Sequence, residues 1–373
     1  EDIGYTDVKV LPLMLDLTKL QGQPDRKTVR MLKDGLINIL FVGRCAPNKK
    51  VEDALTAFFY FHRTVEPASR FIHVGSFAGT ERVISSENLT DRLEDGPEDR
   101  VDAEAYLTAR ITDVFLGDWD RHRGQWRWAT FDTEGPRKWL PVPRDRDQAF
   151  SKFDGLATRI VSLYMPQFVR FEEDYPAIRR LHWNARAIDR WFLAELDREA
   201  WDRVGAQVQA ALTDDVIEQA AFRLPIEIYE LNGEELQQTL RARRDGLDEA
   251  WTEFYELMAK KVDLFATDED EIVRVERERD AFTVSITAPD EGPEPYIRRR
   301  FLASETDEVR IYMQGGDDEL RVTGDADTNM TLRVIGGGDD DRYVVEGRGS
   351  GLRLYDDKGT NVVEGEDAPG LNT

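Results

Sequence analysis

The sequence predicts an α+β protein of three successive parts: a short segment of alternating strand and helix, a mainly helical middle and a C-terminal β region. Three observations predict this class. Two apolar runs flank a helical stretch in residues 36–76, apolar residues recur at helical spacing in the middle of the chain, and the hydrophobic period becomes two from about residue 266. We therefore expect domains at residues 1–82, 83–265 and 266–373.

The first part has the pattern of a βαβ unit. Residues 37–42 and residues 71–74 form apolar runs that predict strands, and residues 51–65 between them predict a helix. A right-handed crossover would place both strands in one parallel sheet. Because the sequence changes character after Thr80, this part has room for half of a Rossmann-type sheet at most, and we expect a βαβ stub.

The middle part is expected to be mainly helical. Residues 101–116 carry apolar side chains that fall on one helix face, at Leu107, Ile111, Val114 and Phe115. A second apolar series at helical spacing follows Asn232, which we expect to cap a helix; its members are Leu236, Leu240, Leu247, Phe254 and Met258. Residues 117–155 lack a helical pattern and are rich in Trp, Pro, Gly and Asp.

The C-terminal part contains an internal repeat. Residues 309–312, 332–335 and 352–355 have the same alternating pattern and begin 23 and 20 residues apart. The first two copies are followed by glycine-rich acidic turns, and all three by a short strand that contains valine. Such spacing is typical of stacked β coils, so we expect a β-repeat, solenoid-like region.

Charge and composition exclude several classes of function. Fifty basic and 74 acidic residues give a net charge of −24, which repels nucleic acid. No run approaches the ~18 consecutive apolar residues of a membrane span. The single cysteine, Cys45, excludes an internal disulfide framework and a multi-thiolate zinc site. We expect no nucleic-acid partner and no membrane span.

Two acidic segments have the composition that phosphoryl transfer needs. Residues 117–126 read GDWDRHRGQW, and residues 143–150 read PRDRDQAF. Phosphoryl transfer requires a carboxylate that orients a hydroxyl group and oxygen ligands that hold Mg²⁺ against the nucleotide phosphates. Asp120 is the candidate base, and Gln125 could offer an amide oxygen to the metal. Asp147 or Asp145 would supply the charged ligand, with the two segments meeting across a hairpin.

This motif pair resembles the catalytic core of atypical kinases, in particular the CotH-type spore-coat kinases and, more distantly, HipA-type and secretory-pathway kinases. The resemblance implies that the middle domain is similar to a kinase C-lobe and uses ATP and Mg²⁺ on an unknown acceptor. It implies Asp120 as the catalytic residue, His122 as a supporting residue and Asp147 as the main Mg²⁺ ligand. The sequence departs from the family at Gln125, where the family has Asn, and in lacking a glycine-rich loop and a strand lysine.

The same block and the β region after it look like a segment of large bacterial surface proteins that carry a metallophosphoesterase domain. That similarity implies the bacterial cell envelope or periplasm, with the cytoplasm as the alternative. A purely structural interpretation also remains open for the acidic segments. Opposite charges there are numerous enough to neutralise one another in an ion-pair network of Asp118, Asp120, Arg121, Arg144, Asp145, Arg146 and Asp147.

Residues 41–53 are similar to the donor-binding domain of retaining glycosyltransferases with two Rossmann-like domains. The resemblance implies that Arg44 and Lys49 hold a nucleotide-sugar diphosphate, and two cations before a helix suit such an anion. The acceptor domain of that family has no counterpart here. The alternatives are therefore a glycosyltransferase fragment, a packing unit with an incidental basic loop, and a chain that joins two unrelated coding pieces near residues 80–84.

The acidic turns of the repeat allow a third function. Residues 336–344 fit a calcium-binding nonapeptide pattern except at Asp339, where that pattern has glycine. Carboxylates of Asp339, Asp340 and Asp341 could bind Ca²⁺. The protein would then be a non-catalytic envelope scaffold, although such acids also occur as solvated turn residues.

Overall fold

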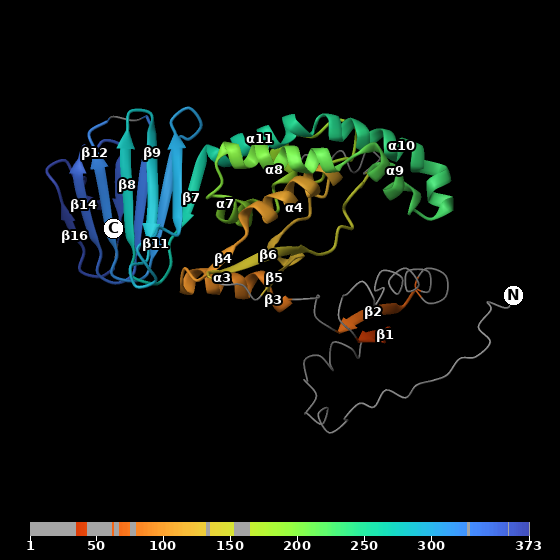
Figure 1. The fold of residues 1–373 in the computed structure, drawn as a ribbon, viewed down its shortest axis with the longest axis horizontal. Coiled ribbons are helices and arrows are strands. Elements are labelled where there is room, and N and C mark those ends of the chain that lie inside the picture. Colours follow the sequence, from red (N-terminus) through yellow and green to blue (C-terminus); the bar gives the residue numbers. More distant parts are fainter. Residues whose placement is uncertain are drawn as a thin grey trace, which may run out of the picture. The chain divides into compact units, whose positions relative to one another are not determined.

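The structure is a computed structural model, and it has a mixed α/β architecture (Figure 1). It divides into two compact units, Glu1–Gly79 and Thr80–Thr373. The residues it describes are 35–42, 62, 67–74, 80–131, 135–152, 165–326, 329–356 and 358–372.

The first unit contains a parallel pair of strands, as predicted. Strand β1 (Ile37–Val42) pairs with β2 (Ser69–Val74) in the register Ile37 to Ser69. The helix expected between them, apart from His62, lies outside the described residues. The cationic positions Arg44 and Lys49 also lie outside them.

The second unit begins with a small mixed sheet flanked by two helices. Its strand order is β3-β5-β6-β4, in which β5 and β6 form an antiparallel hairpin. Helix α4 starts after Asp102, whose carboxylate accepts the Ala105 N–H, and it ends at Gly117, a left-handed residue with φ of 70°. The elements are β3 (Thr80–Ser85), α3 (Ser86–Asp95), β4 (Asp99–Val101), α4 (Ala103–Leu116), the short 3-10 helix η3 (Arg123–Gln125), β5 (Trp126–Phe131) and β6 (Arg137–Pro143).

Between residues 178 and 259 the second unit is helical, as predicted, whereas the sheet of β3 to β6 falls largely within the same predicted helical domain and was not predicted. The helices of this region are α6 (Ile178–Leu181), α7 (Arg186–Phe192), α8 (Arg198–Ala211), α9 (Asp214–Phe222), α10 (Ile226–Asp245) and α11 (Leu247–Ala259). The prediction that Asn232 caps a helix is wrong, because α10 already begins after Pro225 and runs through Asn232. Pro225 is the N-cap residue with an extended ψ of 140°, and a residue before a proline is disfavoured in the α region, so the helix does not continue back into Leu224.

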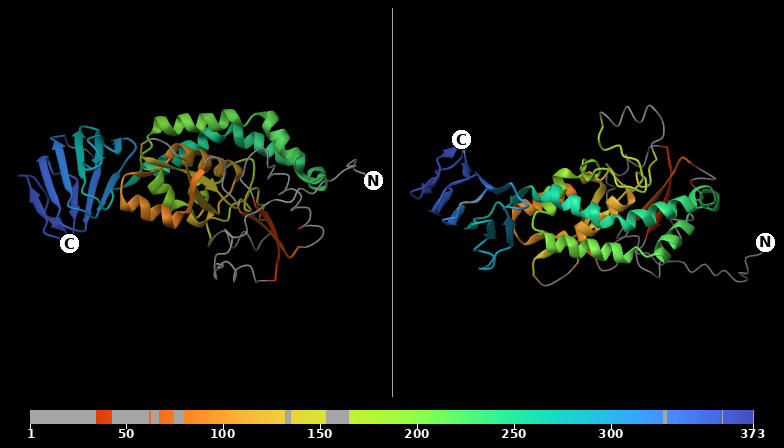
Figure 2. Two further views of the ribbon diagram at one scale, coloured as in Figure 1. Left: turned by 60° about the horizontal axis from the view of Figure 1, so that its bottom comes forward. Right: turned by 90° about the horizontal axis from the view of Figure 1, so that it is seen from above.

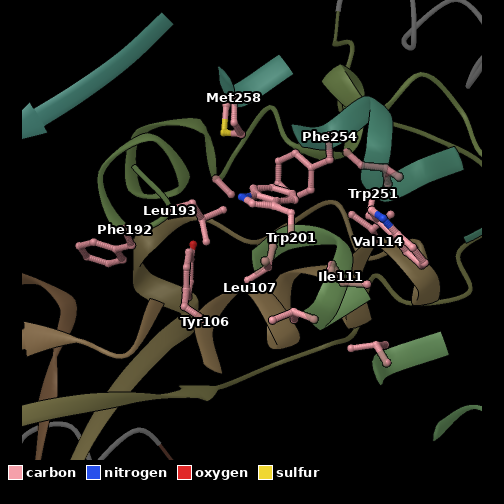
Figure 3. Packing of buried hydrophobic residues seen from close by; sticks show 14 of the residues in the cluster. Tyr106, Leu107, Ile111, Val114, Phe192, Leu193, Trp201, Trp251, Phe254 and Met258 are labelled. Carbon is pink, nitrogen blue, oxygen red and sulfur yellow. The ribbon is translucent and has the colours of Figure 1, made fainter. Parts of the chain in front are cut away.

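One aromatic-rich core joins α4, α8 and α11. Figure 3 shows Tyr106, Leu107 and Ile111 of α4 beside Trp201 of α8 and Phe254 of α11. The Trp201 and Phe254 rings meet edge to face with centroids 5.0 Å apart. Since all these side chains are almost fully buried, the apolar stripe predicted for residues 101–116 faces this core.

The C-terminal strands form two facing sheets that share a second core (Figure 2). One sheet has the order β10-β9-β8-β12-β14-β16 and the other the order β17-β15-β13-β11-β7. The strands are β7 (Lys261–Phe265), β8 (Ile272–Glu278), β9 (Ala281–Thr287), β10 (Ile297–Leu302), β11 (Glu308–Gln314), β12 (Glu319–Gly324), β13 (Thr331–Gly337), β14 (Arg342–Gly347), β15 (Leu352–Tyr355), β16 (Val362–Glu364) and β17 (Leu371–Asn372).

The copies of the sequence repeat pair with one another in register in the structure. Val309 pairs with Leu332, and Leu332 pairs with Leu352, so equivalent positions of successive copies lie side by side in parallel strands. Strand β7 extends the same ladder, because Val262 pairs with Val309. In the described parts of the chain, no helix combines the length and the apolar character required to span a membrane.

Candidate functional site

The two acidic segments of the sequence meet at the base of the β5-β6 hairpin. Residues 118–125 leave the end of α4 and lead into β5, while residues 144–147 follow β6. The Arg144 N–H donates to the Gln125 carbonyl oxygen at 2.8 Å. The prediction that the two segments would meet across a hairpin is therefore confirmed.

A buried arginine fastens these segments together. Arg121 is inaccessible to solvent, and its guanidinium donates to the carbonyl oxygens of Arg144 at 2.6 Å and Asp145 at 2.9 Å. Its Nε donates to Asp113 at 3.1 Å, and its Cζ lies 4.5 Å from the Trp126 ring centre. Because one planar fork serves all these acceptors, it fixes the backbone of both segments relative to α4.

Asp113 is the anionic centre of this arrangement. It is fully buried in α4. Its carboxylate accepts hydrogen bonds from Nη1 of Arg110, Nε of Arg121 and Nε of Arg146, at 3.1, 3.1 and 2.9 Å. Three guanidiniums around one carboxylate compensate the cost of its burial. Sequence reasoning missed Asp113, because it is embedded in the helical pattern of residues 101–116 and has no motif of its own.

A second buried carboxylate continues the network. Asp189 of α7 accepts hydrogen bonds from Tyr106 at 2.7 Å and from Arg110 at 2.8 and 3.1 Å, and its Oδ2 lies 2.8 Å from Nδ1 of His182. Burial alone would raise the pKa of Asp189, but Arg110 and His182 outweigh burial and lower the pKa to about 2. His182 thus has a structural partner in the core.

Asp120 occupies a different environment from these paired carboxylates. Its side chain is half-buried, and its Oδ1 accepts a hydrogen bond from Nδ2 of Asn184 at 2.9 Å. Its backbone N–H donates to Asp118 at 3.2 Å. Burial raises the pKa of Asp118 to about 6, although Arg121 acts against the shift. A neutral amide thus orients Asp120, and no guanidinium of the described residues neutralises it.

The remaining predicted residues differ in exposure: His122 and Gln125 follow Asp120 closely, and Asp145 and Asp147 belong to the second segment. His122 is exposed, and its Nδ1 accepts the Gly124 N–H at 3.1 Å, which caps η3. Gln125 is half-buried. Asp145 and Asp147 are exposed, and Asp145 has a φ of +44°, a conformation that non-glycine residues rarely adopt.

These positions separate the two interpretations of the acidic segments. Arg121 and Arg146 pair with Asp113, and Arg121 also lies 3.5 Å from Asp118. Within the described residues, neither Asp120 nor Asp145 nor Asp147 forms an ion pair with Arg or Lys. An ion-pair network therefore exists, but its central carboxylate is Asp113, which lies outside the two segments. The carboxylates of Asp120, Asp145 and Asp147 take no part in these ion pairs.

The described residues contain no group of three or more His, Cys, Asp or Glu side chains that could hold a metal ion. This finding does not test the Mg²⁺ prediction, because Mg²⁺ is commonly held by one or two carboxylates together with substrate phosphates. Asn184 is a further residue at this site that sequence reasoning missed. It lies 64 positions from Asp120, and no local spacing signals the contact.

The acidic turns of the β region form ladders of hydrogen bonds between coils. The Asp317 N–H donates to Asp270 at 2.8 Å, the Asp340 N–H to Asp317 at 3.0 Å and the Thr360 N–H to Asp340 at 2.6 Å. Asp339 accepts the Gly316 N–H at 3.3 Å. These carboxylates therefore satisfy backbone donors of neighbouring turns.

A second ladder runs inside the first. The Glu271 N–H donates to Asp318 at 2.8 Å, the Asp318 N–H to Asp341 at 3.1 Å and the Asp341 N–H to Asn361 at 2.8 Å. Asp318 and Asp341 are buried. The three residues predicted to bind Ca²⁺ thus each stabilise the stacking of coils, and calcium binding stays a prediction.

Comparisons of the chain with known proteins found no relative. No protein-family model matches the chain, and neither a curated protein nor a solved structure matches it.

Proposed function

We propose that residues 83–265 form a kinase-like phosphotransferase that uses Mg²⁺ and ATP on a hydroxyl acceptor. In this proposal the helical region corresponds to a kinase C-lobe, the first unit to a half-Rossmann stub and the β region to a solenoid. The observation that carries the proposal is the environment of Asp120: a carboxylate held by Asn184, without a guanidinium partner among the described residues, beside a hairpin that presents two further carboxylates.

Each group has a role that its surroundings support. Asp120 would accept the proton of the acceptor hydroxyl or orient that hydroxyl, since its Oδ1 is fixed at 2.9 Å from Asn184 Nδ2. Arg121 would not touch the reactants; it holds the segments of Asp120 and Asp145 together from within. His122 would position the turn after Asp120 through its hydrogen bond with Gly124.

Gln125, Asp145 and Asp147 offer the kind of oxygen donors that a hard divalent cation prefers. Asp145 and Asp147 are exposed carboxylates without a described ion pair, and Gln125 offers an amide oxygen. When bound, Mg²⁺ would neutralise the charge of the nucleotide phosphates. Asp147 and Asp145 with Gln125 are therefore the residues that would hold it.

The test separates metal binding from chemistry. We would titrate the full chain with ATP in the presence and absence of Mg²⁺ by calorimetry, and follow transfer of the labelled γ-phosphate to the chain itself, to hydroxyl-containing peptides and to water. Asp147→Asn should weaken Mg²⁺-dependent ATP binding at least about tenfold. Asp120→Asn should leave that binding within about threefold but lower transfer by roughly 10²–10⁴-fold, as expected for a lost general base.

Asp290→Asn is the matched control. Asp290 is an exposed residue of the β region, and its replacement makes the same chemical change away from the site. We expect it to leave both binding and transfer unchanged. Absence of Mg²⁺-dependent ATP binding in the wild-type chain, or an equal loss in Asp290→Asn, would remove the proposal.

A further inference from the structure

The turn between α9 and α10 exposes large apolar side chains. Phe222 at the end of α9 is 57% exposed, and in the first turns of α10 Ile226 is 62%, Ile228 43% and Leu231 77% exposed. We call these four residues the helical tip. Figure 1 shows α9 and α10 at the end of the helical region that lies away from the C-terminal strands.

The apolar side chains of the helical tip do not form the single stripe of an ordinary surface helix. Successive residues of an α-helix advance by about 100° around the axis. Ile226 therefore lies on the side of α10 opposite to Ile228 and Leu231. The first turns of α10 expose apolar side chains on two sides, with Glu227 and Glu230 between Ile226 and Leu231. Exposed apolar side chains that gather with a polar rim are typical of an interaction surface, so a partner is expected to cover them.

Local packing fixes the helical tip. The Phe222 ring stacks on Tyr229, with centroids 4.8 Å apart and an interplanar angle of 27°. Tyr229 lies directly over Gly233, where any Cβ would collide with its ring, and its hydroxyl accepts a hydrogen bond from Gln237 at 3.1 Å. The turn that carries these apolar side chains is thus held in place by its own aromatic packing.

Acidic side chains surround the helical tip. Glu227, Glu230 and Glu234 are exposed and have no ion pair among the described residues. Arg223 is the one basic residue of the sequence between 222 and 235. This charge opposes a second copy of the chain in a two-fold contact, because the same glutamates would face each other, and it opposes an anionic lipid surface. It favours a partner edged by Lys and Arg.

We propose that the helical tip is a docking site for a partner protein that presents an apolar groove edged by basic side chains. Ile228 and Leu231, which share one side of α10, would enter the groove. Glu227 and Glu230 lie beside them around the helix, on the side towards Ile226, and would face the Lys and Arg side chains at the groove edge, which sets orientation and speeds association more than it adds affinity. This docking site is independent of the proposed phosphotransferase activity.

The experiment uses a labelled amphipathic peptide of leucine and lysine as the probe, because it presents one apolar face flanked by amines. Its binding to the full chain would be followed by fluorescence anisotropy. Ile228→Ser combined with Leu231→Ser keeps every charge and should weaken binding at least about tenfold. Glu227→Lys combined with Glu230→Lys should do the same, and both losses should occur without a change in melting temperature.

The control distinguishes binding at the helical tip from attraction of the basic peptide to the net negative charge of the chain. Glu276→Lys combined with Glu291→Lys makes the same charge change on exposed positions of the β region and should leave binding within about twofold. Equal weakening by this control, or full binding by the double serine variant, would overturn the proposal. Binding to phosphatidylglycerol vesicles that the serine variant abolishes would replace it with a lipid surface, and a dimer that this variant dissociates would replace it with a second copy.

Discussion

Arg121 shows how much of this site depends on one side chain. Its guanidinium reaches a carboxylate, two carbonyl oxygens of the opposite segment and an indole ring while fully buried. A lysine ammonium keeps the charge but cannot reach these acceptors in different directions. We predict that Arg121→Lys lowers the free energy of unfolding by roughly 2–4 kcal/mol, measured by urea denaturation.

Arg123→Lys is the control for this prediction. Arg123 lies two positions away, its side chain is 50% exposed, and it forms a surface ion pair with Glu87 at 3.6 Å. Such pairs contribute little, so the free energy of unfolding should change by less than about 0.5 kcal/mol. Equal losses in the two variants would contradict the role assigned to Arg121.

Asp318 predicts a pH dependence of the β region. Burial is the main cause that raises its pKa to about 9, and the carboxylates of Glu271, Asp341 and Asp270 add to the shift while the Glu271 N–H opposes it. Burial also raises the pKa of Glu271, and that of Asp341 to about 7. Because the folded state binds the Asp318 proton more tightly than the unfolded state does, stability falls as pH rises from about 4 towards 9.

Asp318→Asn should remove part of this dependence. The amide keeps an oxygen for the Glu271 N–H, which is 2.8 Å from Asp318 in the wild type, and it carries no charge at any pH. We expect the melting temperature of the wild type to fall more than that of the variant between pH 5 and pH 9, by at least about 4 °C. Parallel curves would mean that Asp318 titrates near its ordinary value.

At the scale of elements, the turns of the β coils require glycine at particular positions. Gly337 ends β13 with a φ of +131°, and a Cβ there would overlap the Gln314 carbonyl oxygen of the neighbouring strand. We predict that Gly337→Ala lowers the free energy of unfolding by roughly 2–4 kcal/mol through strain and displaced strand pairing. Chemical denaturation monitored by circular dichroism measures it.

Gly370→Ala provides the comparison for that turn. Gly370 is exposed, has no positive φ, and no atom lies within 4 Å of the position that a Cβ would take. Its replacement should change the free energy of unfolding by less than about 0.5 kcal/mol. A large effect at Gly370, or none at Gly337, would show that the stacking of coils tolerates side chains at these turns.

Local periodicity explains which elements could be predicted. The stripe from Leu107 to Phe115 and the repeat at residues 309, 332 and 352 are patterns of neighbouring side chains, and both have direct counterparts in α4 and in the register of β11, β13 and β15. Strand β7 was missed as a member of the ladder, because the hairpin of β9 and β10 interrupts the repeat after it.

The candidate site was predictable only in part, for a related reason. The segments of Asp120 and Asp147 are recognisable because their residues are close in sequence. The residues that organise them, Asp113, Asp189 and Asn184, come from three separate helical segments or turns, and only the packed structure brings them together. Residues 117–126 and 143–150 contain as many Asp as Arg residues, and that composition does not show which carboxylates pair with the guanidiniums.

At the scale of the whole molecule, the helical and β regions of the second unit have separate cores that meet through both apolar and polar contacts. Glu305, between β10 and β11, accepts hydrogen bonds from Arg198 of α8 at 2.9 Å and Tyr255 of α11 at 2.6 Å. Arg299 of β10 donates to the Ala194 carbonyl oxygen nearby. These polar contacts add to the apolar contact of Trp191 with Phe265, whose ring centroids lie 4.9 Å apart, in coupling the unfolding of the two cores.

Removing Glu305 should therefore separate the two cores thermodynamically. In Glu305→Ala, Arg198 and Tyr255 lose the carboxylate that accepts a hydrogen bond from each of them. The cost of removing their donor groups from water is then no longer offset by these hydrogen bonds. We expect differential scanning calorimetry of the full chain to show two resolved transitions from residues 80–373 where the wild type shows one. Glu278→Ala, which breaks only an exposed pair with Arg300 inside the β region, should keep the single transition. If Glu305→Ala also unfolds in one step at an unchanged temperature, the cores are coupled by their packing and not by this polar junction.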